Sequence, residues 1–456
     1  MATENQEELL AMGERVVERA RKAGADVAEA VVSEGSHLST KVRLGEPELV
    51  EEAGSRAVGL RVMVGKQVAV SYTSDLTEAG VARFVEDAIE LARLSQPDEL
   101  SGPPDPSQLS KREEHAELNL YDASIHDIDG AEALAHALAG EKAARDADAR
   151  ITNSEGATFS RASGARALVT SGGFGGVSRG TYASLTVNPV ADDADGKKRS
   201  GYYWTARRHK AGLLAADEVG REAARRTLAK LGAQKAATQE CPVIFDPDVG
   251  RSILGLLAGC INGGAIWRRS SYLVDRVDTQ VASELVNVVD DPLLEGAPGS
   301  RPYDGEGLLS RRNTIVENGV LKSYLLDTYS ARKLGLESTA NASRGSSGGV
   351  GPSTTNFILQ PGTQSPEDVL KSTKSGLYVT EMMGFGFNAV TGDFSRGASG
   401  FWIENGEKTF PVSEVTISLN VDELLKRIDA VADDLDLRTS VATPTFRVSR
   451  MTLAGK

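Results

Sequence analysis

The sequence predicts an α+β protein, with a mixed α/β region first and a mainly antiparallel β domain after it. Apolar residues recur at helical spacing in four segments of the first half, at residues 5–23, 75–92, 128–147 and 215–231. After residue 241 the chain changes to short strand-like runs separated by glycine. Two hairpin signals lie in that half, at Asn318-Gly319 and Asn405-Gly406.

The first hundred residues are expected to form one α/β domain. Its first helix ends before Gly24, and Asp75 has capping-box spacing with Glu78 at the start of the second helix. A turn at Gly65-Lys66 joins two of the strand-like runs between these helices. The four runs are Asp26–Ser33, His37–Leu44, Ala57–Val64 and Gln67–Thr73.

Proline-rich sequence at 101–120 indicates a linker. We therefore expect domains at 1–100, 121–235 and 236–456. The central domain should contain short alternating strands with glycine turns between 148 and 210, including a hairpin tip at 192–198. In the last domain we expect an apolar helix at Ser252–Ile261, a hairpin of Asn313–Glu317 with Val320–Leu325, and a short helix at Asp422–Val431.

Composition excludes several classes of function. The 456 residues carry a net charge of −13, which repels nucleic-acid backbones, so no nucleic-acid partner is expected. No apolar run reaches the roughly 18 residues that span a bilayer, so no membrane partner is expected. The polar, acidic start MATENQEELL and the presence of only two cysteines predict a cytoplasmic protein.

The residues that could bind a metal are scattered. No two of the five histidines have the helical spacing of a zinc motif, so this chain is expected to hold no metal; they are His37, His115, His126, His136 and His209. The acidic run at 192–196 lacks the spacing of a calcium loop.

Nucleophile and nucleotide motifs are also incomplete. No G-x-S-x-G elbow is present, and Ser399 lies in a glycine-rich loop without that spacing. Cys260 lies in the apolar helix, which favours a buried structural thiol. The run at 384–388 lacks the third glycine of a dinucleotide fingerprint.

Long strings in the C-terminal half carry a more specific signal. They are GGAIWRRSSYLVD (263–275), GSRPYDGEGLLSRRNTIVENGVLKSYLLDTYSARKLGL (299–336), TANA (339–342) and GDFSRGASGFWIENGE (392–407). Together with residues 58–76 and 218–235 they resemble the TldD/PmbA family of metalloproteases, and within it the PmbA branch, also called TldE. This resemblance covers nearly the whole chain.

The resemblance implies that one branch of the family binds a catalytic zinc with an H-E-x-x-x-H helix and a downstream cysteine, which the other branch lacks. The matching helix here is 251–264, where Leu254, Gly255 and Gly259 stand at the metal-site positions. None of them can bind metal, and the segment 433–448 contains no cysteine. We therefore expect no cofactor in this chain and zinc in a partner subunit.

The resemblance further implies a heterodimer with a TldD-like, zinc-bearing subunit that degrades or trims short unstructured peptides. In the absence of that partner we expect a homodimer. Two alternatives stay open. One is a homodimeric peptide-binding or scaffold protein without catalysis. The other is an independent hydrolase with an unrecognised nucleophile, for which Cys260 and Ser399 are the candidates.

Several polar residues are candidates for substrate or subunit contact, or for a loop held by its own salt bridges. They are Arg301, Tyr303, Asp304 and Glu306, with Asn341, Ser395 and Arg396 as weaker candidates in polar loops. In the helix at 251–264, Leu254, Leu257 and Ile261 share one face and should be buried. Glycines at 255, 259, 263 and 264 should permit close backbone approach, so a bulky residue at Gly259 should weaken folding or assembly.

Overall fold

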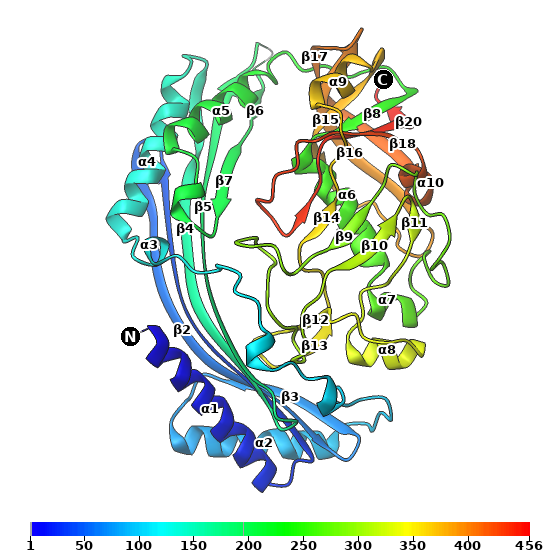
Figure 1. Ribbon diagram of the computed structural model, residues 1–456. Coiled ribbons are helices and arrows are strands. Elements are labelled where there is room, and N and C mark those ends of the chain that lie inside the picture. Colours follow the sequence, from blue (N-terminus) through cyan, green and yellow to red (C-terminus); the bar gives the residue numbers. More distant parts are fainter. Residues whose placement is uncertain (1, 195) are drawn as a thin grey trace.

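The structure, a computed structural model, describes residues 2–194 and 196–456 and confirms the α+β class. A long curved sheet forms one wall of the molecule, and the C-terminal domain lies against its inner face (Figure 1). Within the described residues, no helix combines the length and apolar character needed to cross a lipid bilayer.

The long sheet has seven strands in the described residues, in the order β3-β2-β1-β4-β5-β6, with β7 also paired to β5. Their bounds are β1 (Val27–Arg43), β2 (Glu46–Val64), β3 (Gln67–Thr73), β4 (Ile151–Thr170), β5 (Gly175–Asp192), β6 (Lys198–Ser200) and β7 (Tyr203–Arg207). Because β1 pairs with both β2 and β4, the segments 1–100 and 121–235 contribute strands to one sheet.

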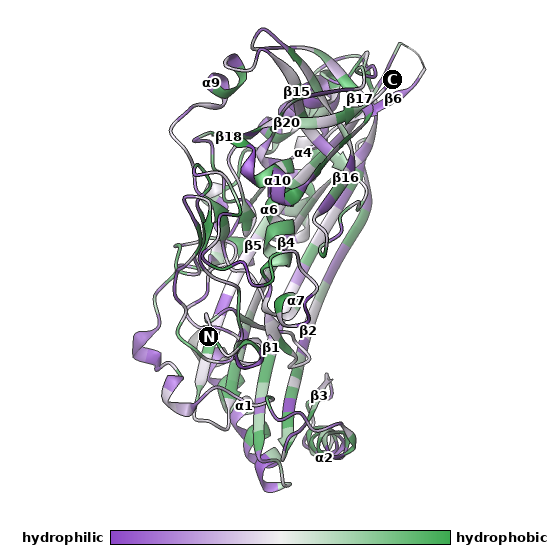
Figure 2. Cartoon of the chain, turned by 90° about the vertical axis from the view of Figure 1, so that its right-hand side faces the viewer, coloured by the Kyte–Doolittle hydropathy of each residue, from purple (hydrophilic) through white to green (hydrophobic). Residues whose placement is uncertain are grey.

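The strands are longer than the sequence predicts. The runs expected at Asp26–Ser33 and His37–Leu44 are one strand, because Gly35 stays in the ladder between Ser55 of β2 and Gly164 of β4. The short strands expected from 148 to 210 are likewise mainly the two long strands β4 and β5. The hairpin expected at 192–198 is confirmed by the pairing of Asp192 with Lys198, while residue 195 of its tip lies outside the described residues. Apolar and polar bands alternate along these strands (Figure 2).

Helices cover the outer face of the long sheet (Figure 1). Their bounds are α1 (Ala2–Lys22), α2 (Glu78–Leu94), α3 (Ala123–His126), α4 (Gly130–Asp146) and α5 (Ala216–Leu228). The predicted start of α2 at Asp75 is wrong. Thr77 caps the helix by accepting the N–H of Gly80 at 3.1 Å, while Asp75 accepts the N–H of Thr77.

A small barrel forms the upper part of the C-terminal domain. Of the described strands, β17-β16-β15-β8-β20 form a continuous order, and an additional β17–β20 pairing closes the ring while β18 extends it. Their bounds are β8 (Gln239–Phe245), β15 (Ser375–Met383), β16 (Asp393–Glu404), β17 (Glu407–Asn420), β18 (Ile428–Val431) and β20 (Phe446–Ala454). Phe245 and Phe446 stack in its core with ring centroids 5.1 Å apart.

Smaller elements complete this domain. They are α6 (Pro247–Cys260), α7 (Gly263–Trp267), α8 (Thr328–Leu334), α9 (Pro366–Lys371), α10 (Val421–Lys426), β9 (Val288–Asp290), β10 (Asn313–Glu317), β11 (Val320–Leu321), β12 (Ala342–Arg344), β13 (Val350–Pro352), β14 (Phe357–Leu359) and β19 (Val441–Ala442). The predicted helix at Asp422–Val431 is wrong beyond Lys426, because Ile428–Val431 pairs with β20 as a strand.

Both asparagine–glycine hairpins are confirmed. Asn318 and Gly319 have φ of 47° and 78°, and Asn405 and Gly406 have φ of 54° and 82°. Positive φ at both central residues is the geometry of the turn that matches the twist of antiparallel strands.

The proline-rich stretch expected as a linker runs along the C-terminal domain. Just before this stretch, Tyr329 donates a hydrogen bond to Asp98 at 2.6 Å. Within it, the carbonyl of Gly102 accepts from Arg332 at 3.1 Å. The N–H of Ser110 donates to the carbonyl of Gly307 at 2.9 Å.

Candidate functional site

Helix α6 presents one face to the barrel core and the other to the space beside the long sheet. It begins where strand β8 ends, with Pro247 at its first position and Asp246 accepting the N–H of Asp248 at 3.1 Å. Leu254, Leu257 and Ile261 are buried, as the sequence predicts. Asp248, Ser252, Gly255 and Gly259 recur at helical spacing on the other face.

The positions expected to match the metal ligands of the zinc branch contain no ligand atoms. Leu254 is buried in the core, whereas Gly255 and Gly259 lie at the surface of α6. Among residues 2–194 and 196–456, no group of three or more histidine, cysteine, aspartate or glutamate side chains is placed to hold a metal ion. The side chains present here therefore do not fit a zinc ion.

The glycines of this region differ in what surrounds them. A Cβ at Gly255 or Gly259 would meet no atom within 4 Å, so the expected close approach is wrong at these two positions within this chain. At Gly263 the expectation is correct, because a Cβ would lie 2.5 Å from Oγ of Ser330 on α8. The exposed face of α6 thus has room for a contact from outside the chain.

A stack of arginines on aromatic rings lies beside this face. The guanidinium of Arg251 on α6 lies 5.2 Å from the ring centroid of Trp204 on β7. Arg438 lies 4.8 Å from the same ring and 5.5 Å from that of Tyr203. Arg226 on α5 lies 4.6 Å from Tyr203. Each guanidinium is attracted to the electron-rich face of the ring beside it. Because the cations and the rings come from both parts of the chain, these contacts join the two halves of the molecule.

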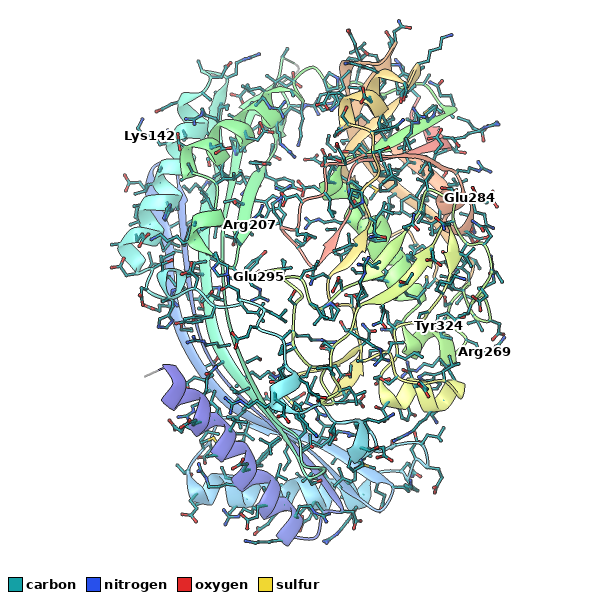
Figure 3. The ribbon with its side chains drawn as sticks, viewed as in Figure 1. Lys142, Arg207, Arg269, Glu284, Glu295 and Tyr324 are labelled. Atoms are coloured by element: carbon teal, nitrogen blue, oxygen red, sulfur yellow. The ribbon has the colours of Figure 1, made fainter. Side chains whose placement is uncertain are left out.

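Arg438 belongs to a bridging segment (residues 433–445) that crosses from β18 toward the long sheet (Figure 1, red). Its guanidinium donates to the carbonyl of Trp204 at 3.1 Å, and its own carbonyl accepts the hydroxyl of Tyr182 at 2.7 Å. Arg207, labelled on β7 in Figure 3, donates to Asp436 at 3.0 Å. Burial raises the pKa of Tyr182, which keeps its hydroxyl protonated as a donor.

Two adjoining cavities lie between the barrel and the edge of the long sheet. Their volumes are about 450 and 320 Å³, and Thr380, Glu381 and Met383 line both. The barrel wall is irregular here, because Thr380 is an extra residue in β15 opposite β16, and β17 has an extra residue at Ser413-Glu414 opposite Ser399 of β16. Bulges free backbone groups from the ladder, so the wall offers hydrogen-bonding groups to a bound chain.

Several charged groups at these cavities are paired, but among the described residues no ion pair engages Arg396, whose buried Nε has no hydrogen-bond partner. Lys230 forms an ion pair with Glu381 and donates to the carbonyl of Ser200 at 2.6 Å. Ser399 lines the larger cavity, but no histidine is among the described residues that line either one. Burial raises the pKa of the Cys260 thiol to about 11, which opposes the thiolate form that a nucleophile needs.

The structure places the predicted cluster at 301–306 inside the protein. Asp304 is 2% exposed and accepts the N–H groups of Glu306, Leu308 and Ala342 at 2.8 to 3.1 Å. Glu306 accepts both the N–H and the hydroxyl of Thr328 at the start of α8, at 2.9 and 2.6 Å. These carboxyl groups hold backbone in place and do not line either cavity.

The other members of that cluster are also buried. Tyr303 packs against His115 and Phe174, with ring centroids 4.8 and 4.9 Å away. Arg301 donates to the carbonyl of Ala340 at 3.4 Å, and burial lowers the pKa of its guanidinium. Among the described residues no ion pair joins the four members. The alternative of a loop held by its own salt bridges is therefore wrong for these residues.

The weaker candidates lie in three different environments. Asn341 is buried and donates to Asp290 at 2.6 Å, Ser395 is exposed on β16, and Arg396 lines the smaller cavity. Of the predicted contact residues, only Arg396 therefore reaches a cavity. The aromatic run Tyr202-Tyr203-Trp204 was not among the predicted site residues. Three consecutive aromatic residues, in a chain with only 5% aromatic residues, could have indicated it.

Three family models match the chain in order. They describe domain 1 (residues 28–92), the central domain (123–231) and the C-terminal domain (238–455) of the PmbA/TldA metallopeptidases. The chain therefore belongs to this metallopeptidase family.

Its relatives include members of the PmbA branch. The chain is 37% identical to the metalloprotease PmbA homolog of Haemophilus influenzae over 440 residues, 96% of this chain and 94% of the relative. It is 35% identical to metalloprotease PmbA of Escherichia coli O157:H7 over 432 residues, 95% and 93% of the two chains.

Solved structures share the fold over nearly the full length. One, described as a modulator of DNA gyrase from Bacteroides thetaiotaomicron, superposes with a TM-score of 0.91 at 26% identity and covers 98% of both chains. TldE from Thermococcus kodakarensis superposes with a TM-score of 0.86 at 23% identity, covering 97% of this chain and 100% of that one.

Proposed function

We propose that this chain is the zinc-free subunit of a two-component metalloprotease that acts in the cytoplasm on short, unstructured peptides. Its partner is a zinc-bearing, TldD-like subunit that supplies the metal and the catalytic base. This chain supplies one wall of the substrate chamber.

The observation that carries the proposal is the exposed face of α6. Leu254, Gly255 and Gly259 offer no atom that can ligate zinc or accept a proton, yet the two glycines leave open space. The segment 433–445, which contains no cysteine, is held by Arg438 against Trp204 and Tyr203. Packing and cation–ring contacts thus stabilise a region that a metal would otherwise organise.

Peptide recognition is assigned to the two cavities beside the bulged strands. Extended peptides are bound most generally through their backbone, by groups that a sheet leaves unpaired. The bulges of β15 and β17 leave such groups beside Thr380 and Ser399. Recognition through the backbone depends little on the side chains of the peptide, which suits a protease that acts on unstructured segments.

Reconstitution tests this function. We expect the purified chain to contain no stoichiometric zinc by elemental analysis and to leave a fluorogenic unstructured peptide uncut. Addition of the zinc-bearing subunit should restore cleavage, and the same mixture treated with a chelator should lose it. Chelator-sensitive cleavage by this chain alone would contradict the proposal.

A further inference from the structure

The smaller cavity beside the barrel, of about 320 Å³, is lined from both halves of the molecule. Helix α6 and strand β15 pack against each other there (Figure 1). Arg396 of β16 reaches the cavity from the barrel, and Tyr202, directly before β7, reaches it from the long sheet. Both side chains carry hydrogen-bond donors, so the two halves present donors to one space.

Arg396 is a cation without an acceptor. Across residues 2–194 and 196–456, its side chain forms no ion pair and no hydrogen bond, and its Nε is buried. The guanidinium lies 5.7 Å from the ring centroid of Phe394, a contact that offers its N–H groups no lone pair. A buried N–H without an acceptor is destabilising, so an acceptor that enters the cavity is favoured at this position.

Tyr202 supplies the second donor. Within the described residues its hydroxyl forms no hydrogen bond, and burial raises its pKa, so the proton stays on the oxygen. Val249 and Met382 contribute apolar surface to the same cavity. Apolar surroundings exclude water and strengthen hydrogen bonds between these donors and a charged acceptor.

The acids that line this cavity already have cations beside them. Asp248 forms ion pairs with Arg226 and Arg438, at 3.7 and 3.6 Å. Glu381 forms an ion pair with Lys230. These pairs neutralise the two carboxylates, so neither is left to pair with a ligand cation.

Over the connected ion pairs, positive charge exceeds negative charge. The acids are Glu222, Asp248, Glu381 and Asp436, and the cations that pair with them are Arg207, Arg225, Arg226, Lys230 and Arg438. Arg251 and Arg396 add positive charge that no ion pair in the described part of the chain neutralises. Asp246 is a further acid near Arg226, but its burial raises its pKa and opposes its negative charge. The cavity therefore favours an anion.

We propose that Arg396 and Tyr202 bind a carboxylate of the peptide substrate. The Nε–H and one Nη–H of Arg396 form a side-on fork that matches the two carboxylate oxygens, and the Tyr202 hydroxyl is a third donor. A single backbone carbonyl would leave part of this fork without an acceptor. The carboxylate comes from the free end of the peptide or from an acidic side chain, which share this chemistry.

The inference rests on the proposed peptide-binding function and adds a charged group to it. Thr380, Glu381 and Met383 line both cavities, so a chain that lies along the bulged strands in the larger one can place a carboxylate in the smaller one. Recognition of a free chain end requires no particular sequence, which agrees with recognition of the rest of the peptide through its backbone.

Peptide binding measured by fluorescence anisotropy tests the inference. One unstructured peptide without acidic residues, labelled with an uncharged N-terminal dye, is compared as the free C-terminal acid and as the amide. The wild-type chain, alone and in a chelator-treated mixture with the zinc-bearing subunit, should bind the acid at least about tenfold more tightly. A third peptide, amidated but with one glutamate near its end, distinguishes the sources. It should bind like the acid if side-chain carboxylates are accepted, and like the amide if only the chain end is.

Variants assign the preference to the two donors. Arg396→Gln should weaken binding of the free acid at least about tenfold and leave binding of the amide unchanged. Tyr202→Phe, which removes one donor, should weaken binding of the acid by about threefold or more. The matched controls are Arg450→Gln and Tyr72→Phe, at exposed positions outside both cavities, and they should change neither affinity.

The outcomes separate this inference from the proposed function. Equal binding of the free acid and the amide by the wild-type chain would overturn the inference and leave recognition of the peptide backbone standing. No binding of any of the peptides, by the chain or by the mixture, would refute both. If Arg396→Gln weakens capture of the zinc-bearing subunit but keeps the preference for the acid, Arg396 contacts the partner instead, and the inference is overturned.

Discussion

Arg344 of the C-terminal domain donates to the carboxylate of Glu29 on the long sheet at 2.9 Å, and both side chains are 1% exposed. Arg61 on β2 donates to the same oxygen at 2.7 Å. Burial opposes the charged form of Glu29, but Arg344 and Arg61 together outweigh it, so its pKa is lowered. This triad joins the two halves of the molecule electrostatically.

Removal of one member should be costly. Arg344→Met leaves the buried Glu29 with a single cation, and we expect a loss of about 3–5 kcal/mol in the free energy of unfolding. Urea denaturation at pH 7 measures it. Arg150→Ala, which removes an exposed pair with Asp148, is the control and should leave stability nearly unchanged. Equal effects of the two variants would refute the role of the triad.

Acid should weaken the same junction. The pKa of folded Glu29 lies below its ordinary value of 4.5, so its contribution is present above pH 4.5 and is lost as pH falls through the lowered value. The stability difference between wild type and Glu29→Gln should therefore shrink as pH falls below 4.5. A difference that stays constant over that range would contradict this linkage.

Glu306 should act in the opposite direction. Burial, with the neighbouring Asp304, raises its pKa to about 8, so the folded state prefers the protonated carboxyl. Its contribution is present below the ordinary value of 4.5 and is lost as pH rises toward about 8. Glu306→Gln mimics the protonated form, so it should flatten this loss and unfold at higher urea than wild type at pH 8.

The control for Glu306 is Glu284→Gln, at an exposed position labelled in Figure 3. It should leave the pH dependence of unfolding unchanged. A steeper decline for Glu306→Gln than for wild type would show that the carboxylate is the favoured form.

The bridging segment should loosen when its cation is removed. Arg438→Ala loses the contacts to Trp204 and Tyr203 and the hydrogen bond to the carbonyl of Trp204. We expect amide exchange at residues 433–440 to accelerate about tenfold, since such contacts are worth about 1–2 kcal/mol. Arg450→Ala, at an exposed ion pair with Glu240, should not alter it.

Glycines around α6 should respond differently to a methyl group. Gly255→Ala meets open space inside a helix and should gain about 0.5–1 kcal/mol. Gly263→Ala would place Cβ 2.5 Å from Oγ of Ser330 and should lose stability. Thermal unfolding of the two variants side by side measures the contrast, and destabilisation by Gly255→Ala would show that α6 is closely covered.

A bulky substitution on the same face of α6 should distinguish an effect on folding from an effect on partner binding. Gly259→Trp should keep the wild-type melting temperature, because a Cβ there meets no atom of this chain within 4 Å. If the zinc-bearing subunit packs on this face, the variant should capture that subunit at least about tenfold more weakly. Ala135→Trp, at an exposed position of α4, is the control. Unchanged capture by Gly259→Trp would place the partner elsewhere.

Structure that depends on neighbouring residues, such as turns, could be predicted from the sequence. Pairing between residues far apart in the chain could not. Asn318-Gly319 and Asn405-Gly406 predicted their hairpins because positive φ is a property of those residues themselves. The junction at Gly35 was misread as a break, since pairing with Gly164 keeps it extended and that partner is far along the chain.

In the candidate site, too, local features were predictable and contacts between distant residues were not. Burial of Leu254, Leu257 and Ile261 follows from helical spacing, and the sequence predicted it. The contact between Arg438 and Trp204 does not, because it depends on how the bridging segment folds back across the molecule. The polar cluster at 301–306 looked like surface because charge suggests exposure, yet backbone N–H groups stabilise Asp304 inside the protein.

The closed ring of the barrel bears on how the chain is made. β8 opens the C-terminal domain at Gln239–Phe245, but its antiparallel neighbour is the last strand, Phe446–Ala454. On the ribosome, β8 must wait with one side unpaired until β20 has been synthesised. A truncated product that lacks β20 could not complete the ring, so quality-control proteases should clear it while chains that contain this strand survive.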